Sequence, residues 1–177
     1  MENIKTIIVL GMHRSSTSMV ARALHEKKEV CMGNNLLLGL PDNPKGHYED
    51  KEFLHLNIDI LNAAGGSWDN VPPHKKILEV APKFENKIKK VIKKASIFAK
   101  KSGYQSWGFK DPRTVLTIDL YMPYLTNPQF IICYRKPKEI AKSLNKRNKM
   151  PIANGIKLTN TYNNRLNNFI KNWLMTT

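Results

Sequence analysis

The stretch TIIVLGMHRSSTS, residues 6–18, decides the fold class. Its first part, Thr6–Leu10, is a short apolar run rich in β-branched residues, which is typical of a strand buried on both faces of a parallel sheet. Gly11 ends the run, and apolar residues return at helical spacing from Met19 onward. A strand, a turn that contains glycine and a helix, in this order, open an α/β nucleotide-binding arrangement. We therefore predict an α/β protein.

The remaining chain supplies the other elements of such a fold. Further strands are predicted at Ser106–Phe109 and Gln129–Tyr134, the second of them buried, and Glu29–Met32 is a weak strand or a turn. Helices are predicted at Asp50–Ala64, Val80–Phe98, Val115–Leu125, Lys138–Arg147 and Thr159–Met175, with Asp50 as a cap. Loops are predicted at Gly39–Gly46 and Gly65–His74. Because no linker or repeat interrupts these elements, residues 1–177 are expected to form a single domain.

The charge of the chain points to an anionic partner. It has 29 Lys and Arg against 14 Asp and Glu, a formal net charge of +15. Nucleic acid, an acidic membrane surface, a sulfated glycan and a nucleotide all fit this charge. Many lysines lie on the predicted helix Val80–Phe98, where a solvated helix face explains them. They are not interleaved with aromatic residues as in RNA-binding modules, so no specific nucleic-acid partner is predicted.

Cysteine content and hydropathy bear on location and on metals. Cys31 and Cys133 are far apart and form no CxxC pair, so we predict neither a metal site nor a disulfide. No apolar run approaches the roughly 18 residues of a membrane span. The N-terminus also has no secretory signal pattern. The sequence therefore predicts a cytoplasmic protein without a membrane span.

The loop Gly11–Ser18 has the length and position of a phosphate-binding loop. A turn that opens into a helix presents unpaired backbone N–H groups and a partial positive charge to an anion. Hydroxyl groups follow at residues 15–18, and Arg14 adds charged donors. The loop lacks the glycine and the lysine of a Walker A sequence, because Ser16 and Thr17 occupy those positions. Kinase or ATPase chemistry is therefore disfavoured.

Four ordered segments resemble a known family, the sulfotransferases that use 3′-phosphoadenosine 5′-phosphosulfate (PAPS). The loop GMHRSSTS is similar to the GMHRSGTS loop of a branch related to bacterial and tyrosylprotein-type enzymes. The other matching segments are NPKGHYE at 43–49, WGFKDPRT at 107–114 and YRKPKEIAKSL at 134–144. The resemblance implies a three-layer, P-loop-NTPase-like α/β fold with a mostly parallel central sheet and flanking helices. It also implies PAPS as donor and PAP as product, with an acceptor that is a carbohydrate, a peptide or a small molecule.

The resemblance assigns roles to individual residues. The 5′-phosphosulfate would be held by Ser15, Ser16, Thr17 and Ser18 together with Arg14. The 3′-phosphate would be bound by Arg135 and Ser143, an arginine at a strand end and a serine eight residues on.

The resemblance and the chemistry of sulfuryl transfer together suggest the catalytic residues. Charge builds on the leaving phosphate, and Arg14 and Lys110 are the candidates that stabilise it without a metal. A surface ion pair with Asp111 is the alternative for Lys110. Glu49 is the first candidate for the base that accepts the proton of the acceptor, and His47 is the second.

Two features depart from the family. Ser16 stands where the family has glycine, so a left-handed backbone at this position would strain the loop. Family members also continue beyond the terminal helix, so a natural short form, a C-terminally truncated chain and a degenerate copy stay open. Two other functions stay open as alternatives, a P-loop small-molecule kinase and a non-catalytic basic protein that binds polyanions or nucleotides.

Overall fold

A computed structural model of the chain describes residues 4–37, 39 and 46–176. Most of the loop predicted at Gly39–Gly46 therefore lies outside the described residues. The strands are β1 (Lys5–Leu10), β2 (Leu36–Leu37), β3 (Glu49–Asp50), β4 (Ser106–Lys110) and β5 (Pro128–Ile132). The helices are α1 (Thr17–Glu26), α2 (Lys51–Ala63), α3 (His74–Glu79), α4 (Ala81–Lys101), α5 (Thr114–Tyr121), α6 (Pro137–Asn148) and α7 (Ile152–Thr176), with a 3-10 turn at Met122–Tyr124.

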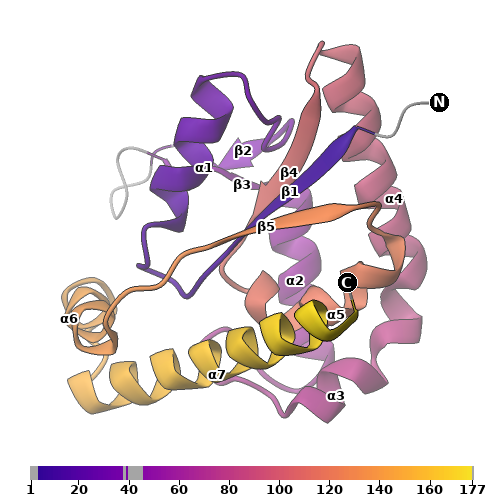
Figure 1. Ribbon diagram of the computed structural model, residues 1–177. Coiled ribbons are helices and arrows are strands. Elements are labelled where there is room, and N and C mark those ends of the chain that lie inside the picture. The colour runs from indigo at the N-terminus through magenta and orange to yellow at the C-terminus, as the bar shows by residue number, and fades with distance from the viewer. Residues whose placement is uncertain (1–3, 38, 40–45, 177) are drawn as a thin grey trace.

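The central sheet is parallel, with β1 between β4 and β5 (Figure 1). Ile8 of β1 stands opposite Phe109 of β4 and Phe130 of β5. The short strands β2 and β3 form a separate antiparallel pair. This arrangement confirms the predicted α/β fold with a mostly parallel sheet.

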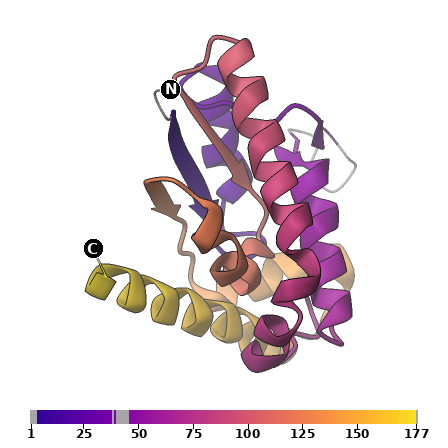
Figure 2. The same cartoon turned by 90° about the vertical axis from the view of Figure 1, so that its right-hand side faces the viewer.

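Helices cover both faces of this sheet, as predicted. Figures 1 and 2 show α1 and α4 on opposite sides of the strands. The alternation of side chains along β1 explains both layers, since successive residues of a strand point to opposite faces. Val9 packs with Ala21 of α1, whereas Ile8 and Leu10 belong to the larger core under the helices from α2 to α7.

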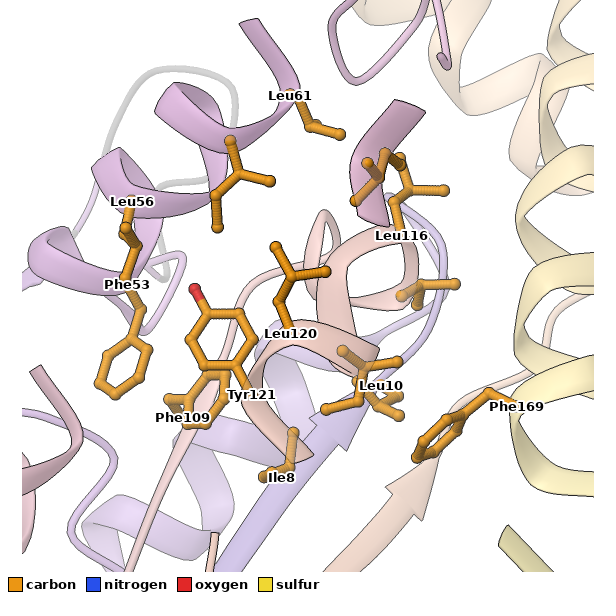
Figure 3. Close-up of a cluster of buried hydrophobic side chains, with 14 of the residues drawn as sticks. Ile8, Leu10, Phe53, Leu56, Leu61, Phe109, Leu116, Leu120, Tyr121 and Phe169 are labelled. Carbon is orange, nitrogen blue, oxygen red and sulfur yellow. The ribbon is translucent and has the colours of Figure 1, made fainter. Parts of the chain in front are cut away.

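The larger core is built around stacked aromatic rings. Phe53 of α2 lies face to face with Phe109 of β4, with 4.0 Å between the ring centroids, and Tyr121 of α5 packs beside both rings (Figure 3). The hydroxyl of Tyr121 is satisfied because it donates to the side-chain carbonyl of Asn57. This core fixes α2 and α5 against β4, whose carboxyl end carries site residues.

Glu29–Met32, predicted as a weak strand or a turn, follows the second alternative: it is a bend with one isolated bridge, between Cys31 and Trp107. Two other predictions were wrong. The predicted buried strand Gln129–Tyr134 is the edge strand β5, and its residues are only partly buried because β1 flanks it on one side alone. Helix α7 begins seven residues earlier than predicted, at Ile152, directly after Pro151.

Candidate active site

The carboxyl ends of the three parallel strands meet around a cavity of about 220 Å³. Ligands of open parallel α/β sheets gather at this edge. The cavity is lined by His13, Arg14, Ser16, Thr17, Ser18, Met19, His47, Glu49, Pro112, Arg135 and Arg147. Apart from Ser15, Lys110 and Ser143, every predicted site residue therefore borders one space. Ser143 and Lys110 hydrogen-bond to Arg14 and Ser18, which line it, whereas Ser15 bonds to the backbone of Met12.

The backbone of the loop after β1 is tightly constrained. A Cβ atom at Gly11 would lie 2.6 Å from the carbonyl oxygen of Cys133, so only glycine fits there. Arg14 and Ser16 both adopt left-handed backbone, with φ of 67° and 71°. The expected strain at Ser16 is therefore present, and such a conformation costs a non-glycine residue about 1–2 kcal/mol.

The hydroxyl groups of the loop do not all face the cavity. Ser15 is buried, and its hydroxyl donates to the carbonyl oxygen of Met12 over 2.6 Å. Ser16, Thr17 and Ser18 line the cavity. Ser15 thus shapes the loop, and the other three residues present hydroxyls and the start of α1 to an anion.

The two arginines of the predicted donor site converge with Ser143. Arg14 Nε donates to Ser143 Oγ over 2.8 Å, and Arg135 Nη1 donates to the carbonyl oxygen of Arg14 over 3.1 Å. Helix α6 is therefore linked to the loop after β1 through Ser143. Arg135 and Ser143, which the sequence analysis paired, thus each contact a different part of Arg14.

Lys110 and Glu49 form a buried ion pair in the wall of the cavity. Lys110 Nζ lies 2.7 Å from Glu49 Oε1, and it also donates to Ser18 Oγ over 3.1 Å. The side chains of the lysine and the glutamate are 0% and 7% exposed. The alternative pairing of Lys110 with Asp111 is not observed, because Asp111 pairs with Arg113 over 2.8 Å. Lys110 thus links the base candidate to the start of α1.

A buried polar network holds the turn that carries Lys110. Asn57 of α2 donates to the Asp111 carboxylate over 2.9 Å and to Thr114 Oγ1 over 3.0 Å, and its oxygen accepts hydrogen bonds from Thr117 and Tyr121. Burial raises the pKa of Asp111, and the neighbouring Arg113 opposes that shift. The sequence interpretation missed Asn57, although a polar residue on the apolar stripe of a predicted helix is a signal for such a role.

His13 and Arg147, two residues of the cavity lining, both contact the ring of Trp68. His13 packs against Trp68 with 4.7 Å between the ring centroids, and the guanidinium of Arg147 lies over the Trp68 ring at 5.7 Å from its centroid. Burial, followed by the positive charge of Arg113, lowers the pKa of His13 well below its ordinary value. The sequence interpretation assigned His13 to loop structure and missed Arg147. Arg147 could have been found from the sequence, because it lies one helical turn after Ser143 and therefore on the same side of α6.

These features define an α/β protein with an arginine- and hydroxyl-lined cavity at the carboxyl edge of its parallel sheet. The sequence matches the model of the sulfotransferase family over residues 6–175, and the chain belongs to that family. Family membership makes the protein a transferase of sulfuryl groups and implies a sulfonate donor and an acceptor. Comparison with curated proteins and with solved structures gave no match. Among the described residues, no helix is long and apolar enough to cross a membrane.

Proposed function

We propose that this protein is a sulfotransferase that moves a sulfuryl group from PAPS to a hydroxyl or amine acceptor. The observation that carries the proposal is the convergence of Arg14, Arg135 and Ser143 beside the loop after β1. PAPS carries one phosphate at its 3′ position and a phosphosulfate at its 5′ position, so it needs two neighbouring anion sites. The cavity offers a loop for one anion and an arginine–serine pair for the other.

The residues present fit such a donor. The start of α1 and the hydroxyls of Ser16, Thr17 and Ser18 suit the 5′-phosphosulfate, in a loop whose shape Ser15 supports. Arg135 and Ser143 suit the 3′-phosphate. Since Ser143 Oγ accepts from Arg14, its own hydrogen is able to donate to a phosphate oxygen.

Arg14 and Lys110 are the residues that we assign to the leaving oxygen. PAPS, when bound, supplies the sulfuryl group and a phosphate leaving group. Lys110 Nζ has three N–H donors, and Ser18 and Glu49 engage two of them. Its burial strengthens its field because little water screens it. A fixed positive charge of this kind stabilises developing negative charge without reorganisation during the reaction.

Glu49 is our first candidate for the base, and His47 is the second. Both line the cavity. Glu49 is held in place by Lys110, so an acceptor hydroxyl that reaches its carboxylate would give up its proton beside the lysine that stabilises the leaving group. Glu49→Gln should stop turnover and spare PAP binding, once an acceptor is identified. Full activity of that variant would transfer the role to His47 or exclude both.

Calorimetry on one arginine variant tests the donor assignment. Arg135→Ala should weaken PAP binding by about 10- to 150-fold, because a hydrogen bond to a charged group contributes about 1.5–3 kcal/mol. Binding of adenosine 5′-phosphate, which lacks the 3′-phosphate, should change much less. Lys138→Ala is the matched control, since it removes one exposed positive charge from the first turn of α6, three residues after Arg135. Equal losses for both nucleotides would contradict the role given to Arg135.

A further inference from the structure

His13 has an unusual environment within the cavity. It is 7% exposed, and its ring is held by Trp68 and, edge to face, by Tyr162 at 6.1 Å. Its Nε2 atom is buried without a hydrogen-bond partner in the part of the chain that the structure describes. A buried polar atom left unpaired costs about 1–3 kcal/mol, so a site that keeps one has a use for it.

Positive groups surround this ring from several elements. Lys110 lies at the end of β4, and Arg113 lies in the turn after it. Arg147 lies on α6, and His47 lies in the segment before β3. Burial is the largest cause that lowers the pKa of His13, and these charges lower the pKa further, so the free imidazole is neutral.

The carboxylates near His13 are already engaged. Glu49 is bound by Lys110 over 2.7 Å, and Asp111 is bound by Arg113 and by Asn57. Asp69, in the loop of Trp68, accepts a hydrogen bond from Ser67 over 2.7 Å. An imidazolium at position 13 therefore lacks an unengaged anion among these groups, and a bound ligand is the natural source of one.

We propose that His13 takes up a proton from solvent when the donor enters the cavity, and that its imidazolium then faces the anionic groups of the donor. The proposal rests on the proposed function, since it needs a polyanionic nucleotide in the cavity that His13 shares with Arg14 and Arg135. The negative charge of the nucleotide outweighs the surrounding cations and attracts the imidazolium, and this attraction opposes the burial that favours the neutral ring. The site thereby gains one positive charge only when the donor is present.

Proton uptake by His13 and proton release by the phosphate of the ligand have opposite signs, so the measured proton exchange distinguishes them. A phosphate monoester has a second pKa of about 6, and a cationic site that selects its dianion releases protons. Protonation of His13 has the opposite sign. By linkage, it also makes PAP binding tighter as the pH falls, by at most about tenfold per pH unit for one proton.

Calorimetry of PAP binding at pH 6.5, in buffers of different ionisation enthalpy, measures this exchange. We expect the wild-type protein to take up about half a proton or more relative to His13→Gln, which keeps a polar side chain but cannot be protonated. His55→Gln, on the exposed side of α2, is the matched control and should behave as the wild type. His47→Gln tests the second histidine of the cavity lining and should retain the uptake.

Isotope-edited NMR of the His13 ring in the wild-type protein, with and without PAP, gives an independent readout if His13→Gln folds poorly. The ring should be neutral at pH 6.5 without PAP and protonated with it. Binding of PAP with a ring that stays neutral would overturn this proposal alone. Uptake that persists in His13→Gln and disappears in His47→Gln would overturn it in favour of His47. A protein that does not bind PAP would overturn the proposed function and this proposal together.

Discussion

Replacement of Ser16 by glycine should stabilise the protein. Ser16 has φ of 71° and ψ of 12°, directly before α1, and its side chain makes no capping hydrogen bond. Glycine adopts this backbone at no steric cost. The substitution therefore removes strain and sacrifices no cap.

The size of the effect follows from two opposing contributions. Release of left-handed strain contributes about 1–2 kcal/mol. Glycine also adds conformational freedom to the unfolded chain, which costs about 0.4–1 kcal/mol. The net gain in the free energy of unfolding should be about 1 kcal/mol, which for a chain of this size raises Tm by about 2–4 °C.

Urea unfolding of three variants measures this gain. Ser16→Gly should be more stable than the wild type, whereas Ser16→Ala keeps the strained Cβ atom and should be close to the wild type. Lys149→Gly is the positive control, because Lys149 has φ of 59° at the C-terminal cap of α6, outside the cavity. If Ser16→Gly is no more stable than Ser16→Ala while Lys149→Gly gains stability, the strain assigned to the loop is wrong.

Three further predictions concern the buried polar groups. Lys110→Met should lower the free energy of unfolding in urea by about 3–5 kcal/mol, because it leaves Glu49 buried and unpaired. Lys94→Met is the control: it breaks an exposed ion pair with Glu52 and should cost less than about 1 kcal/mol. Asn57→Ala should lower the stability by about 3 kcal/mol or more, since it unpairs several buried groups; a loss below about 1 kcal/mol would show that the network is dispensable. His13 has a folded-state pKa below that of the unfolded chain, so the unfolded chain binds more protons and stability should fall as the pH drops below about 6.5, by at most about 1.4 kcal/mol per pH unit. The loss of stability per pH unit should be smaller in His13→Gln. An unchanged loss would show that another group causes the pH dependence.

Local patterns were sufficient to predict the fold. The run Thr6–Leu10 could only be a buried strand, and the glycine and hydroxyl residues after it could only form a turn into a helix. Burial of β5 was mispredicted because the same apolar sequence suits a central or an edge strand, and the order of strands is set by contacts distant in sequence.

The site was predictable where spacing along one element fixed it. Arg135 and Ser143 are separated by eight residues across the start of α6, and this spacing predicted a shared phosphate site, which stays a prediction. The pair of Lys110 with Glu49 joins residues 61 positions apart, and the bond from Arg14 to Ser143 joins residues 129 apart. Such contacts depend on tertiary packing, which no local pattern encodes.

Titration of the wild-type protein with PAP in a calorimeter tests the central claim most directly. The account predicts that one PAP binds per chain without added metal, and that adenosine 5′-phosphate binds more weakly because it lacks the 3′-phosphate. Binding of ATP with magnesium, together with no detectable binding of PAP, would contradict the assignment and favour a kinase.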